Sequence, residues 1–267
     1  MLKEKRFCII GVGKLGGAVA KGLLGAVQAD HLRGAVARSD SAEAASHDLG
    51  IPVGTNNAAA AQDADVIIVA VKPQRMEEAL SSLDGLDLSG RLVISTAAGI
   101  GTDRIESILG NKVAVVRAMP NTPCLLGEGM TALAGGRHAS ADDVSLATAI
   151  FDAVGRTVVV DEALMDGVTA LSASGPAYVF VIIEALAEAG VKLGISREVS
   201  TLLAAQTLRG AAEMVLQLGH HPALLKDEVT TPAGCTIDGL MELEEGKLRV
   251  TLIKAVVKAS QRAGELV

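Results

Sequence analysis

A glycine cluster near the N-terminus has the residue types and the spacing of a phosphate-binding loop. The spacing is G-x-G-x-x-G, and the residues are Gly11-Val12-Gly13-Lys14-Leu15-Gly16. Apolar residues 7–10 precede it, and residues 14–27 carry an apolar residue at every fourth position, so a strand would turn here into a helix. Backbone N–H groups at such a helix N-terminus can hold a pyrophosphate. In a chain with 29 glycines the spacing alone is weak evidence, but its position favours a dinucleotide site over a plain turn.

A second candidate lies about 20 residues beyond the glycine loop, where dinucleotide folds place the residue that meets the adenosine ribose. An acidic residue there favours NAD, whereas an arginine with small polar neighbours favours the 2′-phosphate of NADP. Arg38 and Ser39 follow the strand-like run 34–37, so they predict NADPH, with NADH as the alternative. Asp40 weakens this preference, and an Arg38 that is merely a solvated strand end is the competing interpretation.

Two further strand ends lie along the same predicted sheet. The β-branched run 66–71 suits a strand buried on both faces, and it ends at Lys72-Pro73, where the proline starts a helix. Lys72 could meet the cofactor's phosphate or ribose there, or it could simply point to water. The run 92–95 leads into the small residues Thr96-Ala97-Ala98, which would let the backbone approach the nicotinamide.

A second constellation of small residues and hydroxyls lies late in the chain. It contains Thr230-Thr231-Pro232-Ala233-Gly234-Cys235-Thr236, and an amphipathic helix follows. A helix N-terminus with free N–H groups is a carboxylate site. The alternative is an ordinary helix start, in which Thr231 or Thr236 caps the backbone donors. The residues alone leave both interpretations open.

The elements that position these residues indicate two domains. Strands alternate with helices over residues 1–161, which predicts an α/β Rossmann-type domain with a mostly parallel sheet. Within it, residues 118–123 are predicted to form a rigid, exposed loop between two prolines. Residues 162–267 show helical patterns only, at 162–170, 175–193, 196–218, 222–229 and 247–263, which predicts an all-α C-terminal domain.

The helix predicted from Pro176 is apolar on most sides. Glu184, Glu188 and Lys192 recur at spacings of four and form one narrow polar stripe, and the uncharged run falls short of the roughly 18 residues of a membrane span. A helix of this kind must be buried, and a domain of this size achieves that best against a second copy of itself. We therefore expect an intertwined homo-oligomer and no membrane insertion.

Composition narrows the classes of partner. The net charge of −7 and a pI near 5.3 disfavour nucleic acid and anionic membranes as partners. The three cysteines lie far apart without a C-x-x-C motif, so we expect reduced thiols and no zinc site. The adjacent pair His220-His221 looks like a helix terminus, so no metal is expected. The first residues show no export signal, and we expect a cytoplasmic location.

The sequence resembles the pyrroline-5-carboxylate reductase family over nearly the whole chain. The matching stretches are 11–16, 70–73, 95–99, 117–123 with 128–129, 171–178 and 229–240. The last is the family's specific signature, whereas the glycine loop is common to many folds. Where many members have Pro-Gly-Gly, this chain has Pro232-Ala233-Gly234, which leaves the backbone donors in place.

The resemblance implies an NAD(P)H-dependent reductase that makes L-proline in the last step of proline biosynthesis. It implies an interlaced homodimer and larger rings such as a decamer. The implied cofactor contacts are Gly11 to Gly16, Arg38, Ser39, Asn57, Ala70-Val71-Lys72-Pro73 and Thr96-Ala97-Ala98. The implied substrate carboxylate lies on backbone at Thr231 and at Gly234, Cys235 and Thr236, and Thr236 bonds the ring nitrogen as the catalytic residue.

Two rival functions share parts of this pattern. A β-hydroxyacid dehydrogenase has the same two-domain outline, but it needs a catalytic lysine at the start of the long second-domain helix. Residues 174–189 contain no lysine, which argues against that enzyme. A redox-regulatory oligomer that binds NADP(H) without turnover is the other rival, and only an assay separates it from a reductase.

Overall fold

The computed structural model describes residues 2–110 and 112–265. Their contacts divide the chain into two compact units. The first unit runs to Ser174 and includes the described residues from Lys258 onward, and the second is Gly175–Val257.

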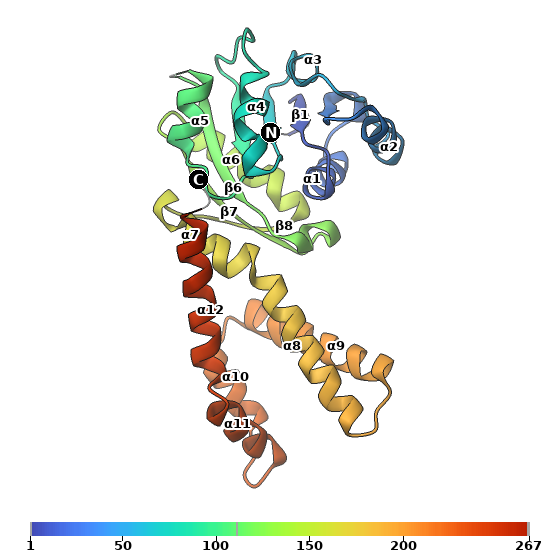
Figure 1. Cartoon of the computed structure of the whole chain (residues 1–267), viewed down its shortest axis with the longest axis vertical. Coiled ribbons are helices and arrows are strands. Elements are labelled where there is room, and N and C mark those ends of the chain that lie inside the picture. The colour runs from blue at the N-terminus through green and yellow to red at the C-terminus, as the bar shows by residue number, and fades with distance from the viewer. Residues whose placement is uncertain (1, 111, 266–267) are drawn as a thin grey trace. The chain divides into compact units, whose positions relative to one another are not determined.

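Within the described residues, the first unit contains one eight-stranded sheet with the strand order β3-β2-β1-β4-β5-β6-β7-β8 (Figure 1). Neighbouring strands are parallel except β6 and β7, which run antiparallel. The strands are β1 (Phe7–Ile10), β2 (Leu32–Ala35), β3 (Val53–Gly54), β4 (Val66–Val69), β5 (Leu92–Ser95), β6 (Ala114–Met119), β7 (Gly129–Gly135) and β8 (Gly155–Val159). Because β1 lies between β2 and β4, the chain reverses direction across the sheet there, and ligands of doubly wound sheets bind at this switch point.

Helices cover both faces of the sheet. One core packs Ile9 and Ile68 against α1 and α6, and the other packs Ile67 against α4 and α5. Strands buried on both faces need apolar residues at every position, which is why β1, β4 and β5 read as continuous apolar runs. The helices are α1 (Lys14–Leu24), α2 (Ser39–Leu49), α3 (Asn57–Ala61), α4 (Met76–Ser81), α5 (Thr102–Leu109), α6 (Ala141–Phe151) and α7 (Met165–Val168).

Hydrogen bonds and ion pairs hold residues 162–174 against the first unit. Glu162 accepts hydrogen bonds from the backbone N–H and the hydroxyl of Thr102, at 2.8 and 2.6 Å. The buried Arg117 on β6 lies 3.8 Å from the Glu162 carboxylate and 3.6 Å from that of Asp166. A π-helical turn, Thr169–Ala173, ends this segment, and the side chain of Asn121 donates to its Ser172 carbonyl at 3.2 Å. These polar contacts explain why the first unit continues to Ser174.

The second unit is helical throughout its described residues. Its helices are α8 (Gly175–Lys192), α9 (Arg197–Leu218), α10 (Pro222–Val229), α11 (Cys235–Glu245) and α12 (Leu248–Ala263), of which α12 continues into the first unit. Figure 1 shows α8 and α9 packed along each other. Gly190 faces Ser200 so closely that a Cβ would overlap its side chain, and Ala187 and Ala204 are buried, so small residues let the two helices approach.

Large apolar side chains on α8 and α9 remain exposed in a single copy. Phe180 and Val181 on α8 are 63% and 64% exposed, and Leu202 on α9 is 67% exposed. Among the described residues, one helical stretch, 162–192, is long and apolar enough to cross a membrane by length and composition alone, and 11% of its most apolar window is buried. Water-exposed apolar faces of this extent mark an interaction surface.

The structure confirms the predicted fold class and differs from the prediction at particular elements. The second strand is Leu32–Ala35 instead of 34–37, because Leu32 pairs with Phe7 while Arg33 interrupts the apolar pattern. The two-residue strand β3 was not among the predicted elements. Residues 118–120 are buried in and after β6, so the prediction that the whole loop 118–123 is exposed was wrong.

Candidate functional site

The glycine loop has the geometry of a phosphate-binding turn. Gly11 has a φ of +96°, and a Cβ there would lie 2.6 Å from the Ala70 carbonyl oxygen, so only glycine fits. A Cβ on Gly16 would overlap the Gly11 carbonyl, which explains the close packing of α1 against the loop. By contrast, a Cβ on Gly13 would meet no described atom within 4 Å. Because Gly13 begins α1 without a side-chain cap, the first N–H groups of the helix face an open space suited to a pyrophosphate.

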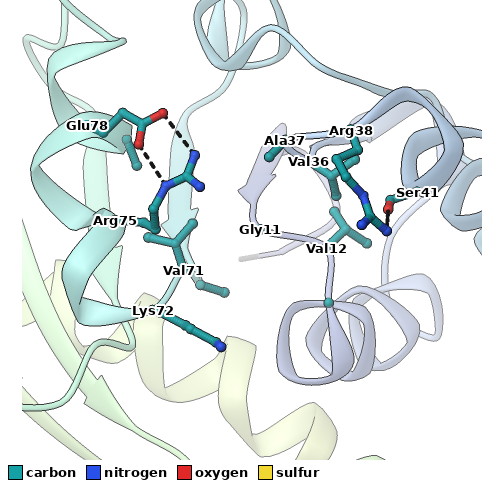
Figure 2. A pocket seen from close by; sticks show the side chains of 13 residues that line it. Gly11, Val12, Val36, Ala37, Arg38, Ser41, Val71, Lys72, Arg75 and Glu78 are labelled. Carbon is teal, nitrogen blue, oxygen red and sulfur yellow. Dashed lines mark hydrogen bonds and ion pairs between the residues drawn. The ribbon is translucent and has the colours of Figure 1, made fainter.

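A pocket of about 400 Å³ opens beside this loop. It is formed by the glycine loop and by the segments that follow β2 and β4 (Figure 2). Of the residues predicted to bind the cofactor, it brings together Gly11, Val12, Gly13, Arg38, Ala70, Val71 and Lys72. A volume in this range and a site at the switch point of a parallel sheet are typical of a small-molecule pocket.

Arg38 begins α2 at the edge of this pocket. Its Nη2 donates to the Ser41 hydroxyl at 3.2 Å, and its Nε lies 3.2 Å from the Asp40 carboxylate. The Ser41 backbone N–H donates to Asp40 and, with the nearby Arg38 charge, holds the pKa of that carboxyl below its usual range. Asp40 is therefore ionised near neutral pH and competes with any bound phosphate for Arg38.

The other predicted cofactor residues do not line this pocket. They are Lys14, Leu15, Gly16, Ser39, Asn57, Pro73, Thr96, Ala97 and Ala98. Asn57 on α3 donates to the Ser82 hydroxyl at 2.9 Å, so its amide already has a structural partner. Thr96 and Ala97 are buried directly after β5, and Ala98 packs against Met119 and Met165 in a small separate cluster.

The sequence interpretation missed six pocket residues, which are Val36, Ala37, Ser41, Arg75, Glu78 and Ala79. Arg75 and Glu78 form an ion pair just beyond Lys72-Pro73. Their i, i+3 spacing after a strand end was visible in the sequence, but such pairs are common on helices. Nothing in that spacing distinguishes a pocket wall from a solvated helix face.

The late constellation forms the N-terminus of α11 in the second unit. Gly234 is the N-cap of this helix, and no side-chain cap hydrogen bond is found there among the described residues. Neither Thr231 nor Thr236 therefore acts as the cap, and the backbone donors at the start of α11 are available to a carboxylate. Ala233 has a φ of +60°, a left-handed conformation that costs a non-glycine residue about 1 kcal/mol.

Comparisons with known proteins cover both units. Residues 162–266 match the family model described as pyrroline-5-carboxylate reductase dimerisation, and residues 6–99 match one described as NADP oxidoreductase coenzyme F420-dependent. A pyrroline-5-carboxylate reductase of Methanosarcina acetivorans is 41% identical to this chain over 99% of both sequences.

The chain belongs to the pyrroline-5-carboxylate reductase family.

Solved structures agree with this assignment. A pyrroline-5-carboxylate reductase from Coxiella burnetii covers 98% of this chain and of its own chain with a TM-score of 0.92 and 36% identity. A pyrroline carboxylate reductase of Plasmodium falciparum, whose structure has NADP bound, covers 98% of each chain with a TM-score of 0.88 and 31% identity.

Membership of the pyrroline-5-carboxylate reductase family confirms the predicted class of enzyme. The chain is an oxidoreductase with a nicotinamide cofactor, acts on a small molecule and associates with itself. The family's dimerisation model begins at residue 162, where the domain boundary was predicted, whereas contacts divide the units after Ser174. The boundary at residue 161 stays a prediction.

Proposed function

We propose that this chain reduces 1-pyrroline-5-carboxylate to L-proline, with the cofactor on the glycine loop and the substrate carboxylate on the N-terminus of α11. The observation that carries the proposal is the uncapped start of α11 at Gly234, in a chain 41% identical to a pyrroline-5-carboxylate reductase. Backbone amides bind a carboxylate without the cost of desolvating a lysine or arginine.

In this reaction, the protein contributes more by orienting the substrate than by general acid catalysis. The nicotinamide supplies a hydride to the carbon of the cyclic C=N bond. An iminium that arrives protonated needs no further proton on nitrogen, so the absence of a histidine from both constellations fits this chemistry. The α11 amides would hold the carboxylate, and the Thr236 hydroxyl would accept a hydrogen bond from the ring nitrogen. Orientation of this kind contributes a large part of many rate enhancements.

We also propose that NADPH is preferred over NADH. Arg38 and the Ser41 hydroxyl at the pocket edge support a 2′-phosphate site, while Asp40 limits the preference. Replacing Arg38 with Asp should lower kcat/KM for NADPH at least about tenfold and leave that for NADH nearly unchanged. An unaltered NADPH-to-NADH ratio would remove Arg38 from cofactor selection.

The assembly that we propose is an interlaced homodimer, with a decamer as its larger ring. The exposed apolar faces of α8 and α9 and the match to a dimerisation model support it. We propose a cytoplasmic location, which the three free cysteines Cys8, Cys124 and Cys235 support.

Steady-state oxidation of NADPH at 340 nm tests the activity. We expect turnover with 1-pyrroline-5-carboxylate and at most trace rates with 2-keto acids and linear imines. L-proline, identified by chromatography, should form in equal amount to the NADPH consumed. Tight NADPH binding with no turnover on any of these substrates would favour the non-catalytic sensor instead.

A further inference from the structure

Two arginine–carboxylate pairs flank the cofactor pocket on facing sides. Figure 2 shows Arg75 with Glu78 on the side that follows β4, and Arg38 with Ser41 on the side that follows β2. Both arginines line the pocket. The hydrogen-bond partners of the two arginines differ in geometry, so the two guanidinium groups can contact a ligand in different ways.

Glu78 holds the guanidinium of Arg75 by its edge. The Arg75 Nε lies 2.7 Å from Glu78 Oε2, and the Arg75 Nη2 donates to Glu78 Oε1 at 2.9 Å. These two parallel contacts form a fork that fixes the plane of the guanidinium and occupies its Nε–Nη2 edge. Arg75 keeps its Nη1 end and its flat face, and the face stacks well on aromatic rings.

Arg38 is held more loosely. It makes one 3.2 Å contact to Asp40 and one 3.2 Å hydrogen bond to Ser41, and neither forms a fork. Its side chain is 74% exposed, against 54% for Arg75. A phosphate can therefore replace these long contacts with a forked pair on the Nε–Nη2 edge of Arg38, whereas the same edge of Arg75 already holds a complete fork.

Stability of the fold does not explain the Arg75–Glu78 pair. Exposed ion pairs of this kind contribute little to stability. A comparable pair outside the pocket, Arg104 with Glu77 at 3.1 Å, joins α5 to α4 and provides a structural reference on the same helix.

Apolar side chains line the space between the two arginines. Val36, Val71 and Ala79 contribute to this lining, which suits a flat heterocycle better than a charged group. We infer that Arg75, fixed by Glu78, is the platform on which the cofactor's adenine ring stacks, while Arg38 on the opposite side reads the 2′-phosphate. This inference rests on the proposed function, because it assumes that the pocket holds the adenosine half of the cofactor.

Dissociation constants of the full-length protein for NADH and NADPH, measured by nicotinamide fluorescence, test the inference, with 5′-AMP and adenosine 2′,5′-bisphosphate as competitors. Arg75→Ala should weaken all four ligands by the same factor, about fivefold. Arg75→Lys should not restore binding, because an ammonium keeps the charge but has no flat face. Arg38→Ala should weaken only the two ligands that carry a 2′-phosphate. The control Arg104→Ala should change none of them.

Three outcomes would overturn the platform role. One is a loss in Arg75→Ala confined to the 2′-phosphorylated ligands, and another is full rescue by Arg75→Lys, since either would make Arg75 a charge contact. The third is unchanged affinity in Arg75→Ala, which would leave the proposed function standing if the unmodified protein binds all four ligands. Failure of the unmodified protein to bind 5′-AMP and the bisphosphate would instead remove the proposed cofactor site itself.

Discussion

At the start of α11, main-chain and side-chain groups can divide the work of binding a small ring acid. The N-cap Gly234 supplies no side-chain cap, so the first N–H groups of the helix can take a carboxylate, while the Thr236 hydroxyl can meet a different atom of the ligand. Because neither threonine is used as a cap, a change at Thr236 can alter chemistry without removing a helix-capping bond.

Thr236→Val should lower kcat/KM for 1-pyrroline-5-carboxylate by about 10- to 100-fold, which corresponds to one hydrogen bond to a charged group. The dissociation constant for NADPH, measured by fluorescence, should stay within about twofold. Thr230→Val is a matched control in the same loop, because the Thr230 hydroxyl donates to the Lys226 carbonyl at 2.8 Å. Full turnover in Thr236→Val would remove Thr236 from the site.

Thiol labelling can test whether a ligand binds at the start of α11. Burial raises the pKa of the Cys8 thiol to about 12 and also raises that of Cys124, while Cys235 is exposed. Only a thiolate reacts quickly, so a maleimide at pH 7.5 should label Cys235 and spare the other two. L-proline should slow that labelling in a concentration-dependent way, as followed by mass spectrometry. Labelling that proline leaves unaffected would contradict a ligand beside Cys235.

At the scale of elements, the turn from β1 into α1 gives its glycines different tasks. A Cβ on Gly16 would overlap the Gly11 carbonyl, whereas a Cβ on Gly13 would enter open space. Gly16 therefore allows close packing of α1 against the loop, whereas Gly13 leaves space for a ligand.

Gly16→Ala should therefore destabilise the protein by about 1–3 kcal/mol in urea denaturation. Gly13→Ala should keep its stability within about 0.5 kcal/mol and weaken NADPH at least about tenfold, because the new methyl group would occupy the space of the pyrophosphate. Equal effects of the two substitutions on stability and binding would show that the loop is only a structural turn.

Long apolar runs made most elements predictable from the sequence. The bounds of β1, β5 and α10 were predicted to the residue, because short, mainly apolar runs mark the two strands and a proline marks the start of the helix. β3 has two residues and no pattern of its own, so only its pairing with β2 creates it. Residues 118–120 lie between Arg117 and Asn121 and look like part of a loop, yet they are buried, and Ala118 and Met119 pair with β7.

Some residues of the candidate site were likewise predictable from the sequence, and others were not. Gly11, Gly13 and Arg38 were predictable because a backbone motif and its usual distance to the second strand end mark them. Arg75 and Glu78 were missed because their part in the pocket depends on tertiary structure, which places the segment after β4 across the pocket from the segment after β2. Local sequence carries no sign of that position.

In the whole molecule, we expect self-association to cover the exposed apolar faces of α8 and α9. Static light scattering should give a dimer or a larger assembly. Replacing Val181, which is 64% exposed, with Glu should shift the mass toward the monomer, because charges are disfavoured in an apolar interface. Glu184→Gln, on the polar stripe of the same helix, should leave the mass unchanged. A well-behaved monomer of the unmodified chain would refute the interlaced assembly.

The most direct measurement is a crystal structure of the protein with bound L-proline. We expect the proline carboxylate on the backbone N–H groups at Gly234 to Thr236, with the ring nitrogen within hydrogen-bond distance of the Thr236 hydroxyl. Well-defined proline density at another place, with the N-terminus of α11 empty, would contradict the account.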